Sequence, residues 1–213
     1  MTARLRRRIR AAFYRRRVTT SGASTEPAAF RAAVESMHQA TVRPEIEIGT
    51  IRPPQRLAPF SHAIGAEVRQ PEPDEIPTDS EGTAFGRLIL LHDPSGQEAW
   101  DGTMRLVAYI QAELEAALAT DPMLPEVAWS WLTDALESGL AVTALGGTVT
   151  STTSVRYGDI AGPPRAHQLE MRASWTAQDI DLAPHVEAFA SVLASAAGLP
   201  PAGVTRLGSI GSA

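Results

Sequence analysis

The sequence predicts an α+β fold, with a single antiparallel sheet of about five strands and helices packed mainly on one face. Two groups of segments have the apolar pattern of strands, and segments with helical spacing lie before, between and after them. The links between successive strands are too short for the crossovers that a parallel sheet needs. The predicted order of elements is therefore α-βββ-αα-ββ-α.

The first half of the chain supplies one helix and three strands. Apolar residues recur at helical spacing over residues 27–40, beginning at a proline suited to a first helical turn. The alternation over residues 45–48 is typical of a half-buried strand, and residues 57–69 fit a strand better than a helix. Residues 70–82 are Pro-rich and acidic, which predicts a mobile surface loop. The uninterrupted aliphatic run of residues 88–91 predicts a central strand.

Two helices, a hairpin and a last helix follow. The first of these helices, over residues 103–119, is predicted from apolar residues at steps of three and four: Leu106, Val107, Ile110, Leu114 and Leu118. The second helix covers residues 125–137. Residues 142–157 are rich in Thr and Val, and residues 166–175 alternate strictly, so we expect the two segments to pair as a hairpin. The pattern of residues 182–197 predicts the final helix.

Charge divides the chain into a basic start and an acidic body. Arginines dominate before the first acid, Glu26, whereas most of the 24 acids follow it. Such a body repels nucleic-acid phosphate, so we expect nucleic-acid binding only through the Arg-rich start. We predict a disordered leader and linker over residues 1–26, one α+β domain over residues 27–201 and a flexible tail over residues 202–213. Whether residues 1–17 are translated stays open, because Val18 is an alternative start.

Several kinds of chemistry are excluded by composition. The chain has no cysteine and no lysine, which excludes thiol nucleophiles, thiolate metal sites, Schiff-base lysines and the lysine of phosphate-binding loops. Its five histidines form no closely spaced metal-binding pair. No stretch approaches the roughly 20 apolar residues that span a bilayer. We therefore expect no cofactor, no metal and a cytoplasmic location.

The candidate catalytic residues lie in the polar segment that follows the aliphatic strand: His92, Asp93, Glu98 and Asp101. The histidine with one of the three carboxylates could supply a general base with its orienting acid, or a metal site with nitrogen and oxygen ligands. The alternative interpretation is backbone shaping. Residues 93–96 have the composition of a β-turn, and Asp101 or Thr103 would cap the helix expected to follow. Backbone shaping accounts for most of the segment.

The four tryptophans divide into two kinds. Trp131 and Trp175 lie on patterned apolar faces and are expected in the core. Trp100 and Trp129 lie off these faces, which favours an exposed apolar patch that binds a partner. We expect a non-catalytic binding or adaptor module with a protein partner, for which a second copy of the chain is one candidate. The alternative is a hydrolase or metal-dependent enzyme that uses the loop from His92 to Asp101.

Three segments carry a resemblance to a known family: LLHDPSGQEAW (90–100), LPEVAWSWLTDALE (124–137) and the hairpin GTVTSTTS…EMRASWT. They resemble the actinobacterial DUF3000 proteins, and the resemblance runs from about Phe30 to Pro201. It implies a soluble intracellular protein and assigns no catalytic residue. The order of elements is also similar to the α-βββ-α-ββ-α order of the type III secretion chaperone-like fold, whose members are mostly dimeric binding modules. A likeness of fold alone transfers no function.

Overall fold

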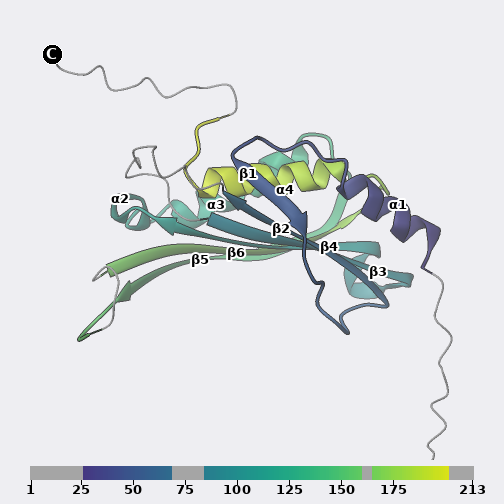
Figure 1. The fold of residues 1–213 in the computed structure, drawn as a ribbon, viewed down its shortest axis with the longest axis horizontal. Helices are drawn as coiled ribbons and strands as arrows, with labels where there is room; N and C mark the ends of the chain where they lie inside the picture. Colours follow the sequence, from purple (N-terminus) through teal and green to yellow (C-terminus); the bar gives the residue numbers. More distant parts are fainter. Residues whose placement is uncertain (1–25, 69–83, 160–164, 202–213) are drawn as a thin grey trace, which may run out of the picture.

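The computed structural model describes residues 26–68, 84–159 and 165–201. Within these ranges, six strands form one antiparallel sheet in the order β1-β2-β3-β4-β6-β5. The strands are β1 (Ile46–Thr50), β2 (Phe60–Val68), β3 (Ala84–Gln97), β4 (Gly102–Leu114), β5 (Val142–Val155) and β6 (Arg165–Ala177). The helices are α1 (Ala28–Met37), α2 (Ala116–Ala119), α3 (Leu124–Glu137) and α4 (Ala183–Ala196), with a 3-10 turn, η1 (Glu98–Trp100). Figure 1 shows α1, α3 and α4 on one side of the sheet, which confirms the predicted class.

The first four strands form a meander, because each pairs antiparallel with the next along the chain. The chain then passes through α2 and α3 before it returns to the sheet. β6 pairs with β4 on one side and with β5 on the other. In the described part of the chain, β5 is therefore an edge strand that joins the sheet through β6 alone, and β1 forms the opposite edge.

The core lies between the sheet and the helices. On β4, Leu106 and Ile110 are fully buried on the helix side, whereas Tyr109 between them points to the other face and is half-buried. The helix α4 lies over the centre of the sheet, and its Phe189 and Leu193 are both 0% exposed. Burying side chains of this size removes enough apolar surface from water to supply most of the driving force for the fold.

The segment predicted as a helix over residues 103–119 is instead the strand β4, followed by only four helical residues in α2. Its buried side chains alternate along the chain: Met104, Leu106, Ala108, Ile110 and Ala112. Two members of this series are alanines, which are apolar but small, so the helical spacing of the larger side chains dominates the sequence pattern. Backbone hydrogen bonds to β3 and β6 on both sides decide the outcome, and the sequence pattern does not contain them.

The other predicted elements that lie in the described ranges are present. The helices expected over residues 27–40, 125–137 and 182–197 correspond to α1, α3 and α4, and the expected hairpin is β5 with β6. The aliphatic run at residues 88–91 lies inside the longer strand β3. The predicted leader, with its nucleic-acid role, the loop over residues 70–82 and the tail lie outside the described residues, apart from Glu26.

The face of the sheet opposite the helices is the more polar one. The Tyr109 hydroxyl donates a hydrogen bond to Gln111 Oε1 (2.8 Å) and lies 2.9 Å from Glu170 Oε2. The Arg172 guanidinium lies over the Tyr109 ring, 5.6 Å from its centroid. No helix in the described ranges is long and apolar enough to cross a membrane.

Candidate functional site

His92 is a core residue at the end of the regular pairing between β3 and β4. Its side chain is 4% exposed and stacks on Phe30 of α1, with the ring centroids 5.8 Å apart. Phe60 of β2 lies 6.0 Å from the same ring. The Nδ1 atom of His92 lies 3.0 Å from the carbonyl oxygen of Thr103 on β4. The imidazole is therefore held between aromatic rings and a backbone carbonyl, which is an arrangement that stabilises the core.

Asp93 shapes the backbone beside it. Its Oδ1 accepts hydrogen bonds from the Ser95 backbone N–H (3.1 Å) and hydroxyl (2.6 Å), and its Oδ2 accepts one from Gln97 Nε2 (3.3 Å). These bonds, above all that from the Ser95 side chain, hold the pKa of Asp93 below its usual value. Gly96 then has φ 74°, a left-handed conformation that glycine adopts without strain. The register of pairing with β4 shifts between His92 and Gln97, so this segment is an irregularity in a hairpin.

Glu98 and Asp101 lie at the tip of the β3–β4 hairpin, where Glu98 begins η1 and Asp101 follows it, and both are exposed. Asp101 has φ 53° and caps no helix, contrary to expectation, because a strand follows it. Among the described residues, no hydrogen bond joins His92 to the three carboxylates, and no three His, Asp or Glu side chains form a group that could hold a metal ion. A catalytic role for the four candidates stays a prediction.

Trp129 lies across the edge strand. It projects from α3, is half-buried, and packs against the core. A Cβ atom placed on Gly147 of β5 would lie 2.8 Å from the Cζ3 atom of the Trp129 ring. The indole therefore occupies the space that the missing side chain leaves free.

Trp100 lies in η1 near the beginning of the same strand. Its carbonyl oxygen accepts a hydrogen bond from the Thr176 hydroxyl on β6, and its side chain is half-buried. The next residue, Asp101, accepts a hydrogen bond from Thr143 Oγ1 of β5 through its own carbonyl oxygen (3.3 Å). Both Trp100 and Trp129 thus adjoin the first part of β5. Their role in partner binding stays a prediction.

Trp175 and His185 form a buried polar pair. The Trp175 indole Nε1 donates a hydrogen bond to His185 Nδ1 (3.2 Å), and the two side chains are 0% and 2% exposed. Burial lowers the pKa of His185 to about 4, although the nearby Asp179 and Asp181 oppose this shift. The neutral imidazole is the form that can accept this bond, so the pair is a structural contact between β6 and α4.

A second pair of histidines lies near the other edge of the sheet. His62 of β2 and His38, which follows α1, meet edge to face with ring centroids 5.1 Å apart. The Nε2 atom of His62 is buried and lacks a hydrogen-bond partner among the described residues. Burial, and then the neighbouring His38, lower the pKa of His62. With two histidines and no third ligand grouped with them in the described ranges, the pair does not make a metal site.

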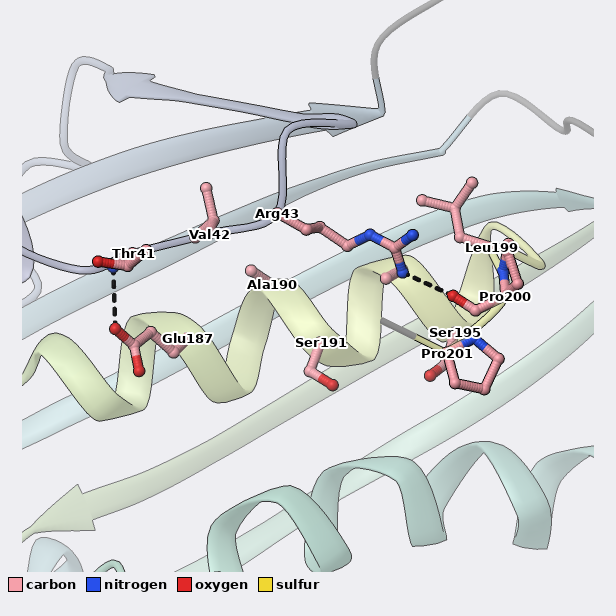
Figure 2. A pocket seen from close by; sticks show the side chains of 11 residues that line it. Thr41, Val42, Arg43, Glu187, Ala190, Ser191, Ser195, Leu199, Pro200 and Pro201 are labelled. Atoms are coloured by element: carbon pink, nitrogen blue, oxygen red, sulfur yellow. Dashed lines mark hydrogen bonds between the residues drawn. The ribbon is translucent and has the colours of Figure 1, made fainter. Parts of the chain in front are cut away.

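A groove of about 380 Å³ runs between the α1–β1 connection and α4 (Figure 2). Its walls are Thr41, Val42 and Arg43 on one side and small residues of α4, with Leu199 to Pro201, on the other. Two hydrogen bonds hold its walls together, from the Thr41 backbone N–H to Glu187 Oε1 (2.9 Å) and from Arg43 Nη1 to the Pro200 carbonyl (2.8 Å).

The charged groups of this groove are engaged with each other and with the backbone. Arg43 forms a two-point ion pair with Glu45, with Nε–Oε2 3.0 Å and Nη2–Oε1 2.9 Å, and this contact lowers the pKa of Glu45 to about 2. Three N–H donors of the Arg43 side chain are thus bound by Glu45 and Pro200. These contacts join residues 41–45 and 200 to α4.

The feature that sequence reasoning did not single out is the outer edge of β5. This strand runs for 14 residues, and from Gly146 to Val155 it pairs with β6 in unbroken register. It contains no charged residue and no proline, and most of it is exposed. The signal in the sequence was this long neutral run of Thr, Ser, Val and Gly. What the sequence lacked was the strand order, which places the run at an edge.

The chain matches the model of a family described as "Protein of unknown function (DUF3000)" over residues 26–205. The match spans every residue that the structure describes. No curated protein and no solved structure matches the chain. The order of elements has four strands before the middle helices, so it departs from the α-βββ-α-ββ-α order on which the similarity to the secretion chaperone-like fold depended.

Proposed function

The chain belongs to the DUF3000 family, and we propose that it is a cytoplasmic, non-catalytic binding module that takes a strand of a protein partner onto the outer edge of β5. The single observation that carries this proposal is that edge, which is long, neutral and regular over residues 146–155. In an edge strand, every second residue directs its backbone N–H and C=O away from the sheet. These groups are a template for an added strand.

The composition of β5 supports this role. Soluble proteins protect their sheet edges with lysine, proline, inward charges or very short strands, because an open edge pairs with other chains. β5 has none of these devices over its regular part. Its one irregularity, between Thr143 and Gly146, includes Ala144 with φ 49° and lies at the beginning of the strand. From Gly146 to Val155 the pairing with β6 is regular, and no second strand pairs with β5 among the described residues.

The two tryptophans support the same surface. Strand addition obtains its affinity from backbone hydrogen bonds and its specificity from side chains that flank the new strand. Trp129 lies over Gly147 on the helix side, and Trp100 lies near the end of the sheet where Thr143 contacts η1. Large aromatic side chains at such positions contribute much of the binding energy at interfaces.

The geometry of the ionisable loop supports binding over catalysis. His92 contacts aromatic rings and a backbone carbonyl, and the oxygens of Asp93 are engaged by Ser95 and Gln97. A general base needs a free nitrogen within reach of a substrate proton and an acid that orients its ring. Here the Nδ1 atom of His92 faces a backbone carbonyl instead of an acid, and the Asp93 carboxylate binds Ser95 and Gln97.

The test is affinity purification from the native host with the unmodified chain and with Thr150→Lys/Thr152→Lys, which adds two cations to the exposed edge of β5. We expect a recurrent partner that the unmodified chain retains and the double variant loses. Thr50→Lys, on the opposite edge strand β1, is the matched control and should retain the partner. Circular dichroism must show that both variants are folded.

Trp100→Ala is the second arm of this test. It should weaken capture of the same partner while leaving the melting temperature nearly unchanged, because the Trp100 side chain is only half-buried. A partner that binds the β5 variant as tightly as the unmodified chain would place the binding surface elsewhere and overturn the proposal. Activity of the purified chain on substrates, lost on replacement of His92 by Gln, would favour the enzyme instead.

A further inference from the structure

We propose that the strand added to β5 is β5 of a second copy, so that two chains form one continuous antiparallel sheet about a two-fold axis. This inference rests on the proposed function, because it identifies the partner of the same edge. A closed two-fold pairing uses the same surface on both copies, and it removes the open edge from each of them. The argument depends on how β5 fits its own copy.

The register of such a pair is nearly determined by symmetry. A two-fold axis that relates neighbouring antiparallel strands stands perpendicular to the sheet, so the helices of both copies lie on the same side. Residues that face each other must then point to the same face of the sheet. Centred on the regular part of β5, the axis passes beside either Thr150 or Ser151, each opposite its own copy.

Nothing along β5 opposes this arrangement. Self-pairing of a charged strand places like charges opposite each other, which is destabilising. β5 carries no charge, and its Thr and Val residues favour extended backbone. Figure 1 shows the end of β5 and the beginning of β6 projecting from the body of the molecule, away from α3 and α4, and α2 is the helix that contacts this part of the sheet.

Apolar side chains complement each other across the axis. Val149 pairs with the buried Met171, so Val155, six residues on, also points to the helix side, and it is 44% exposed. With Ser151 opposite Ser151, Val155 of the second copy lies opposite Gly147, where Trp129 covers the strand. The dimer would bury Val155 against this indole at two equivalent places.

Charged groups lie near both ends of β5. Glu98 and Asp101 lie near its beginning, where η1 contacts the strand, and both are exposed. Arg156 and Arg165 lie at its far end.

A group of the opposite charge also lies at each end. Asp159 lies close in sequence to the basic end, and Arg105 lies at the acidic end, where it donates hydrogen bonds to the Ala144 carbonyl (2.8 Å) and the Ser174 hydroxyl (2.7 Å). Backbone hydrogen bonds and the Trp129–Val155 contact therefore hold the proposed pair, and charge does not decide its orientation.

The test measures the molar mass of the full chain by light scattering after size exclusion, over a range of micromolar concentrations. We expect twice the 22.7 kDa of one chain. Thr150→Lys/Thr152→Lys and Thr150→Glu/Thr152→Glu should each be monomeric, because like charges then face each other across the axis. An equimolar mixture of the two variants should return to the dimer mass, which a merely unfolded variant could not do. Thr50→Lys on β1 should stay dimeric.

The outcomes separate this inference from the proposed function. A dimer that survives in both charged variants lies on another surface and overturns the inference. A monomeric unmodified chain also overturns it; if this chain still captures a different protein through β5, the proposed function stands. A monomer with no capture that depends on β5 contradicts both proposals. Dimerisation with loss in each variant and recovery in the mixture supports the inference.

Discussion

The two edges of the sheet differ in every property that controls strand pairing. β1 has five residues and includes Glu47, and the ion pair of Arg43 with Glu45 lies just before it. β5 has 14 residues and no charge. One edge is thus short and charged, as edges of monomers commonly are, and the other is long and neutral. The difference indicates that β5 can accept a further strand, whereas β1 is protected from strand pairing.

The largest expected effect is a pH dependence of the free energy of unfolding that arises from His185. His185 contacts β6, the neighbour of β5, and its pKa is lowered to about 4, whereas His62 on β2, the neighbour of β1, is less buried. Because the folded state prefers neutral His185, the unfolded state binds more protons between pH 6.5 and 4. The free energy of unfolding should therefore fall as pH falls through this window, by about 3 kcal/mol from this group.

Denaturant unfolding at a series of pH values checks this prediction, with His185→Gln as the control. The glutamine oxygen can accept the Trp175 hydrogen bond at every pH. The free energy of unfolding of the variant should fall less steeply between pH 7 and pH 4 than that of the unmodified chain. Because both chains contain the same carboxylates, the difference between the two slopes reports His185 alone. Equal slopes would show that His185 is not the group responsible.

A smaller effect is expected from two adjacent glycines of β5. A Cβ atom on Gly147 would collide with the Arg172 carbonyl and the Trp129 ring, whereas one on Gly146 would meet no atom within 4 Å. Gly147→Ala should cost about 1–3 kcal/mol of unfolding free energy, because strand or indole must move. Gly146→Ala should change it by less than about 0.5 kcal/mol.

Thermal denaturation of the two glycine variants measures the difference in their stability. Light scattering measures whether each variant still forms the proposed dimer through β5. Gly147→Ala should also weaken the dimer, since it displaces Trp129 from the strand. Equal stability of the two variants would mean that Trp129 is free to move away from Gly147 without cost.

The smallest effect is expected beside β1, the protected edge. Arg43→Gln removes the part-buried ion pair with Glu45 and the hydrogen bond to the Pro200 carbonyl, which together should contribute about 1 kcal/mol. The pKa of Glu45 should rise from about 2 toward that of an ordinary carboxyl, which an NMR titration can follow. The molar mass should not change. A new oligomer in this variant would mean that charge, more than strand length, protects β1.

Local patterns predicted the fold class and most elements. α1, α3 and α4 have strong helical periodicity, and the strict alternation of residues 166–175 identified β6. The failure at residues 103–119 has a physical cause. Ala108 and Ala112 hide the alternation of β4, and the hydrogen bonds that decide between strand and helix come from β3 and β6, which are distant in sequence.

The site was less predictable than the fold. Turn chemistry around Asp93 and Gly96 was visible in the sequence, because an aspartate bonds its own backbone and glycine tolerates positive φ. That His92 would stack on Phe30 could not be read from either segment, since the contact joins α1 to β3. The position of β5 at an edge depends on strand order, which local patterns do not encode.

Because β6 lies between β4 and β5, a strand that is synthesised after both of them completes the pairing between them. Until residues 165–177 emerge, β4 has one row of backbone groups without a partner strand, although it was synthesised much earlier. The helix that covers the centre, α4, is made later still. Nascent chains that stall before residue 165 therefore expose the unpaired backbone groups of β4, which can pair with other chains. Premature termination should yield aggregates instead of a smaller folded domain.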